Sequence, residues 1–114
     1  MERVCLTIPI LSGTLDKARA FFEELESDRY ASYQDSQARI GVVSETWFIG
    51  KVAGRDTVLG FVTYKDFTRA VEIFSASSDE FDVWFKQGLK GFTGLDLDNP
   101  PELDLPTLVS DFPR

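Results

Sequence analysis

Three large aromatic side chains with one polar atom each are the residues of this chain best suited to bind a small molecule. They are Trp47, Tyr64 and Trp84. Such side chains combine a large apolar area with one hydrogen-bonding group, which suits a small-molecule pocket. Arg39 and Tyr33, which precede them in the sequence, are predicted to close the mouth of that pocket. The alternative interpretation is that the three aromatic rings simply fill the core.

The chain of 114 residues contains no histidine. This absence excludes Ser-His and Cys-His nucleophilic systems, and it excludes zinc and haem bound through histidine. It also removes the side chain that most often acts as a general base. The single cysteine, Cys5, cannot form an internal disulfide, and we interpret it as a small core residue rather than a nucleophile.

Nineteen acidic side chains offer candidate ligands for a divalent cation. Two groups of them lie close together in sequence, at 79–82 and at 96–104. Neither group has the spacing of an EF-hand loop. We interpret them as the solvated start of a helix and an acidic loop, and we predict no metal site and no cofactor.

Composition indicates one soluble globular domain over residues 1–114. A net charge of −7 opposes general binding to nucleic acid and to anionic membrane surfaces. No apolar run approaches the ~20 residues of a membrane-spanning helix. The N-terminal residues lead straight into a predicted strand without a signal-peptide pattern, so a cytoplasmic location is expected.

The elements that must position these residues follow from apolar periodicity. The segment 42–64 contains two apolar runs joined by a polar turn at 53–56, which predicts a β-hairpin. An apolar period of two predicts strands, and a period of three to four predicts helices. The predicted strands are 3–10, 42–53, 57–65 and 105–112, and the predicted helices are 14–27, 66–76 and 79–90. Residues 28–39 are polar and without period, and they are predicted to form a loop, with a helical turn within it as the alternative.

Both faces of the strand at 57–64 are rich in apolar side chains. An antiparallel strand with one face in water should instead alternate apolar and polar residues. One interpretation is a central strand with a few tolerated apolar groups at the surface. The other is that a second sheet, supplied by an identical subunit, covers the face that the helices leave free.

The predicted order β-α-β-β-α-β is the ferredoxin-like split pattern, an α+β fold. Five segments carry a resemblance to a known superfamily: the strand at 3–10, the helix at 14–27, the hairpin GVVSETWFIGKVAGRDTVLGFVTYKDFTRA, the segment SSDEFDVWFKQGL and the terminal strand. In these segments the chain resembles the dimeric α/β-barrel superfamily. This resemblance implies a four-stranded antiparallel sheet with helices on one face. It also implies a homodimer formed through the sheet faces, with a ligand cavity between sheet and helices.

The resemblance does not identify an activity. Haem-degrading members and sugar mutarotases of that superfamily depend on a histidine, which this chain lacks. Cofactor-independent monooxygenases use Asn and Trp with a Tyr or Arg, and the only asparagine here is Asn99. We therefore expect a small dimeric protein of the uncharacterised group, whose pocket binds a small ligand or none. The alternative is a monooxygenase-like enzyme that needs no cofactor and acts on a small hydrophobic or aromatic substrate.

Overall fold

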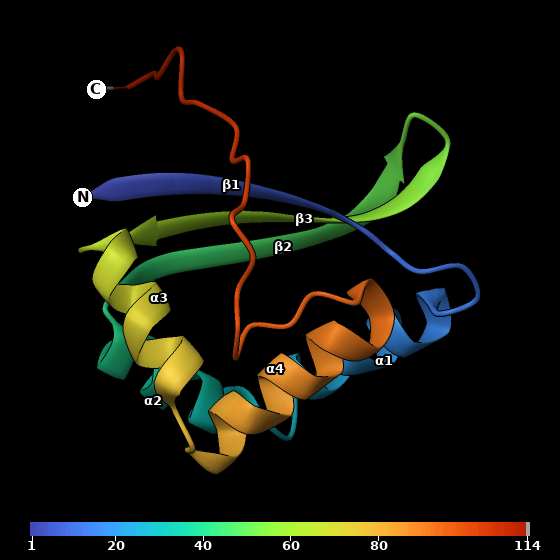
Figure 1. Cartoon of the computed structure of the whole chain (residues 1–114), viewed down its shortest axis with the longest axis horizontal. Coiled ribbons are helices and arrows are strands. Elements are labelled where there is room, and N and C mark those ends of the chain that lie inside the picture. Colours follow the sequence, from blue (N-terminus) through green and yellow to red (C-terminus); the bar gives the residue numbers. More distant parts are fainter. Residues whose placement is uncertain (114) are drawn as a thin grey trace.

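A computed structural model describes residues 1–113 as two layers, an antiparallel sheet and a layer of helices that covers one face of it (Figure 1). This arrangement agrees with the predicted α+β class. No helix in the described residues is both long and apolar enough to span a bilayer. The elements in chain order are β1 (Glu2–Pro9), α1 (Leu15–Glu26), α2 (Tyr30–Ile40), β2 (Val42–Val52), β3 (Arg55–Tyr64), α3 (Phe67–Ala76) and α4 (Glu80–Thr93).

The sheet places β3 in the centre, between β1 and β2. The hairpin that joins β2 to β3 turns through Ala53 and Gly54, which both have positive φ angles, as a two-residue hairpin turn requires. Side chains alternate along β3, so Val58 and Val62 are buried under the helices. Phe61 lies on the opposite face with 49% of its surface exposed. This opposite side is called the free face below.

One predicted loop is a helix. Residues 28–39 were expected to be irregular, but α2 occupies most of this segment and ends at Gly41, whose φ is +80°. The buried face of α2 consists of Tyr33, Ser36 and Ile40, which have helical spacing. The buried residues of α2 therefore follow a helical period, but the middle one, Ser36, is polar. The pattern of apolar residues alone does not indicate this helix.

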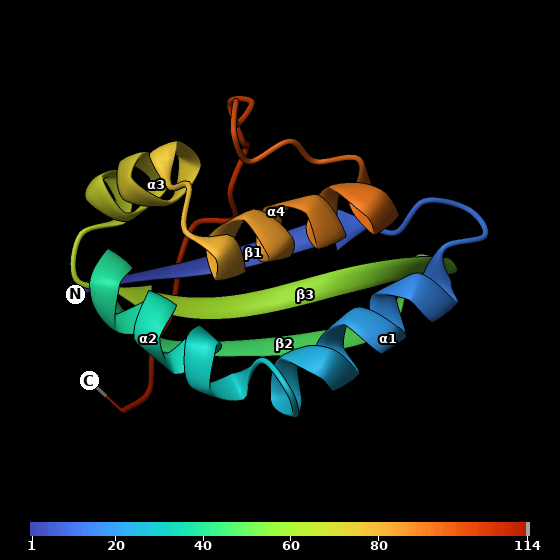
Figure 2. The same cartoon turned by 90° about the horizontal axis from the view of Figure 1, so that it is seen from below.

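The predicted strand at 105–112 does not form. Residues 94–113, called the tail below, contain no helix or strand. The tail leaves the end of α4, passes the edge of the sheet at β1 and reaches the free face (Figures 1 and 2). Neither side of it is buried as a strand would require, since Val109 and Phe112 are almost fully exposed. An ion pair between Asp111 and Arg3 holds its end near β1.

The helical layer has an aromatic core of its own between α1 and α4. Phe21 of α1 contacts the rings of Phe85 and Phe92 of α4, with ring centroids 5.2 and 5.3 Å apart. Gly88 makes this close approach possible, because a Cβ atom at this position would lie only 2.4 Å from the Phe21 ring. A Cβ at Gly91, one turn later, would meet nothing within 4 Å.

These two glycines of α4 provide a matched test of the packing. Gly88→Ala should lower the free energy of unfolding by about 1–3 kcal/mol, because the added methyl group pushes against a buried ring. Gly91→Ala should leave it unchanged or raise it by up to about 1 kcal/mol, because alanine is the better helix former. Urea unfolding of both variants measures the difference. Equal effects would show that α1 and α4 do not pack as closely as described.

Candidate functional site

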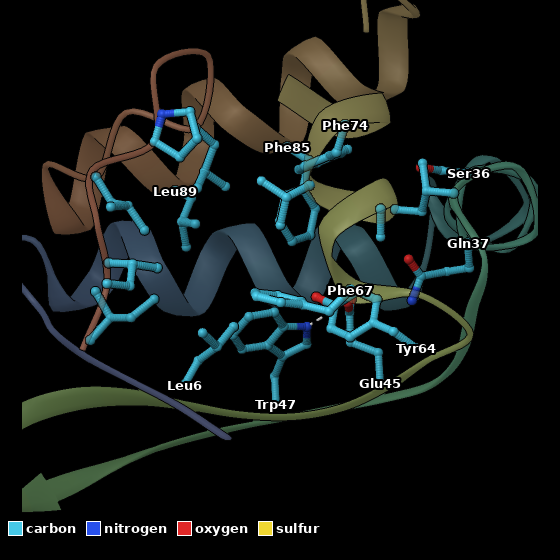
Figure 3. A pocket seen from close by; sticks show the side chains of 18 of the residues that line it. Leu6, Ser36, Gln37, Glu45, Trp47, Tyr64, Phe67, Phe74, Phe85 and Leu89 are labelled. Atoms are coloured by element: carbon cyan, nitrogen blue, oxygen red, sulfur yellow. Dashed lines mark hydrogen bonds between the residues drawn. The ribbon is translucent and has the colours of Figure 1, made fainter. Parts of the chain in front are cut away.

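A cavity of about 510 Å³ lies between the sheet and the helical layer, and we call it the central cavity (Figure 3). β1, β2 and the end of β3 form its floor, and α2, α3 and α4 form its walls. The irregular tail closes the remaining side with residues of 95–105. Its lining is mostly apolar and comprises Leu6, Ile8, Tyr33, Ser36, Gln37, Ile40, Glu45, Trp47, Tyr64, Phe67, Ala70, Val71, Phe74, Phe81, Phe85, Leu89, Leu95, Leu97, Pro100, Pro101, Glu102, Leu103 and Leu105.

The indole of Trp47 lies on the floor of the central cavity. Trp47 stands opposite Gly60 in the register of β2 and β3. A Cβ atom at Gly60 would be 2.5 Å from this indole, so only glycine lets the ring lie flat against the neighbouring strand. The rings of Phe22 and Phe85 pack around Trp47, with centroids 5.8 and 6.3 Å away. The position of Trp47 is therefore fixed by packing on several sides.

A carboxyl group, that of Glu45, stands beside Trp47 on the same strand face. Its Oε2 atom accepts a hydrogen bond from Nε1 of Trp47 at 3.0 Å and another from the hydroxyl of Tyr33. Burial raises the pKa of Glu45, and the hydrogen bonds from Tyr33, Trp47 and Gln37 offset only part of that rise. All of these partners are neutral, so no positive charge compensates the carboxylate.

Two tyrosine hydroxyls near Glu45 remain protonated at all ordinary pH values. Burial raises the pKa of Tyr33, and the nearby Glu45 carboxyl raises it further. Burial, with a smaller contribution from Glu45, also raises the pKa of Tyr64. Both hydroxyls are therefore hydrogen-bond donors, and that of Tyr33 already donates to Glu45. Tyr64 lies at the α3 end of the cavity, close to Phe67 (Figure 3).

Three of the five residues predicted to bind a ligand line the central cavity, namely Tyr33, Trp47 and Tyr64. Trp84 does not. Its ring stacks on Phe21 at a centroid distance of 4.6 Å, and the guanidinium of Arg29 lies 4.7 Å from the Trp84 ring centroid. The structure thus brings Trp47 and Tyr64 together but places Trp84 in the packing between α1 and α4. Whether the three cavity residues bind a ligand stays a prediction.

Arg39 does not close the mouth of the cavity. It lies in the last turn of α2 and forms ion pairs with Asp35, Asp79 and Asp82. Tyr33 was also expected on a loop at the mouth, but it lies on α2 and is buried. The role that the sequence suggested for Arg39 is therefore replaced by a structural one.

The second buried acid, Asp82, is fully enclosed with 0% of its surface exposed. Its oxygens accept hydrogen bonds from Ser36, Arg39 and Ser77. Burial raises the pKa of Asp82, but these hydrogen bonds and the charge of Arg39 outweigh that effect, and the pKa is lowered overall. Asp82 is therefore a compensated structural anion, unlike Glu45.

Sequence reasoning missed Glu45. The signal for it was available, because residues 45, 47 and 49 share one face of the predicted strand and two of them are large and apolar. An acid in that row lies on the face that the helices cover. Gln37 was missed as well, because it lies in the segment that was expected to be a loop.

A second, more open hollow of about 830 Å³ adjoins the central cavity, between α1 and the outer edge of β2. Tyr33, Glu45 and Trp47 line both spaces, so this cluster forms the partition between them. Arg19, Glu23 and Glu26 of α1 also line the outer hollow.

Within residues 1–113 no group of three or more Cys, Asp or Glu side chains is arranged to hold a metal ion. Asn99, the only asparagine, lies in the exposed tail and does not line the central cavity. The Asn and Trp pair of the monooxygenase pattern is therefore not assembled in this cavity. Comparisons with protein-family models, with curated proteins and with solved structures find no match.

The two buried acids should make opposite contributions to the pH dependence of stability. Because the pKa of Glu45 is raised, the folded state favours the protonated carboxyl. Its contribution to stability is full below the ordinary carboxyl pKa and is lost as the pH rises through the raised value. Glu45→Gln keeps an oxygen for Tyr33 and Trp47, so it should raise the free energy of unfolding at neutral pH and change it little at about pH 4.

Asp82→Asn is the matched control, because the pKa of Asp82 is lowered. The stability that Asp82 gives is full above its ordinary pKa and is lost as the pH falls through the lowered value. This variant should therefore be least stable, relative to the parent protein, at neutral pH. Urea unfolding over a pH series measures both variants. A Glu45→Gln variant that is less stable than the parent at neutral pH would contradict the description of Glu45 as an uncompensated acid.

Proposed function

We propose that this protein binds a small, largely apolar molecule in the central cavity, and that it does so as a homodimer of ferredoxin-like subunits. The observation that carries the proposal is a cavity of about 510 Å³ with apolar walls and a few polar groups on its floor. Ligand sites typically have volumes of about 300–1,000 Å³ and this kind of lining. The polar groups converge, since Tyr33, Glu45 and Trp47 are joined by hydrogen bonds.

Support for a ferredoxin-like subunit comes from the order of the elements. The antiparallel strands have the order β1-β3-β2, and the helical pair α1 and α2 connects β1 to β2. This corresponds to the first three strands of the split β-α-β pattern. The outer edge of β1 carries no paired strand among the described residues, and the tail passes this edge where a fourth strand would lie (Figure 2).

The two tryptophans allow a direct test of ligand binding. A neutral aromatic alcohol such as 4-phenylbutanol should change the tryptophan emission of the parent protein as it fills the central cavity. Trp84→Phe should keep this response, because Trp84 lies outside the cavity. Trp47→Phe should lose it while the protein stays folded by circular dichroism. A response that depends on Trp84 instead, or no response in the parent protein, would contradict the proposal.

Support for a homodimer comes from the free face. Its central side chains are uncharged, and Phe48 and Phe61 are 47% and 49% exposed with ring centroids 5.8 Å apart. The set that shares this face comprises Cys5, Thr7, Thr46, Phe48, Leu59, Phe61 and Thr63. Soluble monomers rarely expose a continuous apolar patch of this kind. The face away from the helices is therefore the one that we assign to the partner subunit.

The dimer predicts twice the chain mass of 12.9 kDa in light scattering at micromolar concentration, through an interface of more than about 1,200 Å². Phe61→Asp should give a folded monomer, because a charge would then be buried without a partner. Tyr30→Asp is the control, since Tyr30 is similarly exposed but lies on the helical layer. A parent protein that is monomeric, or a Phe61→Asp variant that remains dimeric, would contradict this assembly.

A further inference from the structure

The charges around the central cavity are of one sign. No lysine or arginine is among the described residues that line it, and the chain has no histidine. Two acids do line it, Glu45 on the floor and Glu102 on the exposed tail. Binding of an anionic ligand would therefore be unfavourable, because its charge would be buried in a largely apolar space next to acidic side chains and without a cation.

Two basic side chains on the helical walls, Lys86 of α4 and Arg39 of α2, are held elsewhere. The ammonium of Lys86 donates to the backbone oxygens of Phe74, Ser75 and Ser77 at 2.9–3.3 Å and pairs with Asp98 at 2.7 Å. Arg39 is engaged by the acids described above. Neither cation can turn toward the central cavity without giving up these partners. Arg19 of α1 lines the outer hollow, and no hydrogen bond or ion pair joins Glu45 to a basic side chain among the described residues.

The hydrogen bonds already made by Glu45 orient it for a ligand. Tyr33 and Trp47 both donate to Oε2, and the side chain of Gln37 is a third neutral donor to this carboxyl group. Figure 3 shows Glu45 and Trp47 rising from β2 toward Phe74 and Phe85 on the helices opposite. A charged donor placed in this space would reach the carboxylate at one end. At the same time, aromatic rings would surround its apolar part and could contact its charge through their faces.

We propose that the ligand of the central cavity is an organic cation, a protonated primary or secondary amine carried on an aromatic or aliphatic body, with its ammonium group bound by Glu45. This assignment rests on the proposed ligand-binding function and specifies its chemistry. An ammonium supplies a positive partner that no lysine or arginine in the lining of the central cavity provides. The net charge of −7 also favours the approach of a cation over that of an anion.

Three probes with one phenylbutyl body test the proposal by titration calorimetry of the full chain at neutral pH. They are 4-phenylbutylamine, 4-phenylbutanol and 4-phenylbutanoate, which differ only in the charge of the polar end. The amine should bind more tightly than the alcohol by about tenfold or more, as expected for a charge-assisted hydrogen bond. The carboxylate should bind most weakly.

Two single substitutions locate the charge that is responsible. Glu45→Gln should reduce the affinity for the amine about tenfold or more and so remove most of the preference for the amine over the alcohol. Glu102→Gln should retain most of the preference, because Glu102 is exposed and its charge is screened by solvent. Loss of the preference in Glu102→Gln but not in Glu45→Gln would overturn the assignment to Glu45.

If Glu45→Gln fails to fold, the relative affinities of the parent protein for the three probes still test the organic-cation proposal. Equal affinity for the amine and the alcohol, or tighter binding of the carboxylate, would overturn the organic-cation proposal and leave the ligand-binding function standing. Failure of all three probes to bind would overturn both.

Discussion

The buried carboxylate of Asp82 holds the helical layer together, and the central cavity depends on it. It accepts hydrogen bonds from Ser36 and Arg39 of α2 and from Ser77, which links α3 to α4. Lys86, one turn further along α4, donates to the carbonyl groups of Phe74 and Ser75 in the last turn of α3 and so satisfies acceptors that a helix end leaves open. Removing one partner from such a buried network costs several kcal/mol, because it leaves a buried charge without compensation.

This network explains how an empty space can persist under the helices. The end of α3 is bound to α4 by polar contacts, since Lys86 donates to the carbonyl groups of Phe74 and Ser75 and the following Ser77 donates to Asp82. The apolar contacts of the layer are concentrated instead between α1 and α4, around Phe21 and Gly88. The helices are therefore joined to one another by the Asp82 network and by the aromatic contacts of Phe21, and the central cavity lies between this layer and the sheet.

Two acids in one small domain show how their neighbours decide whether a carboxylate is structural or available for chemistry. Asp82 is the more buried, yet its pKa is lowered because an arginine and two hydroxyls compensate the charge. Glu45 has neutral donors alone, and its pKa is raised. Groups whose pKa is shifted by burial inside a cavity are candidates for function, whereas a compensated ion pair fits a structural role. The same reasoning separates Arg39, which belongs to the structural network, from the residues that line the central cavity.

The sequence predicted most of the fold, because long elements carry a clear apolar period. The strands β1, β2 and β3 and the helices α1, α3 and α4 lie within a few residues of their predicted positions. α2 was missed because Ser36 occupies its buried face, where it binds Asp82, a residue far away in sequence. The strand predicted at 105–112 fails for a different reason, since its apolar residues bracketed by prolines suit an edge strand but no neighbour buries either side of it.

The site shows the same limit. Residue type alone selected Trp47, Tyr64 and Tyr33, because an aromatic ring with a polar atom is suited to a cavity wherever it lies. Residue type could not show that Trp84 stacks on Phe21 of α1, or that Arg39 forms ion pairs with three acidic side chains, because these contacts depend on how the helices pack against one another. Glu45 had a signal in the strand alternation, but its importance depends on the missing counter-charge, which appears only once the other walls are known.

The walls of the central cavity differ in how firmly they are held, and this difference bears on how a ligand could enter. The floor is a hydrogen-bonded sheet, and the helical walls are fixed by the Asp82 network and the aromatic core. The tail has no secondary structure, and its ionic ties are Asp98 with Lys86, Asp96 with Lys90 and Asp111 with Arg3. Local opening is least costly where buried contacts and backbone hydrogen bonds are few. Displacing the tail therefore exposes the cavity at the smallest cost in free energy, while Glu45 and Trp47 stay fixed on the rigid strand opposite.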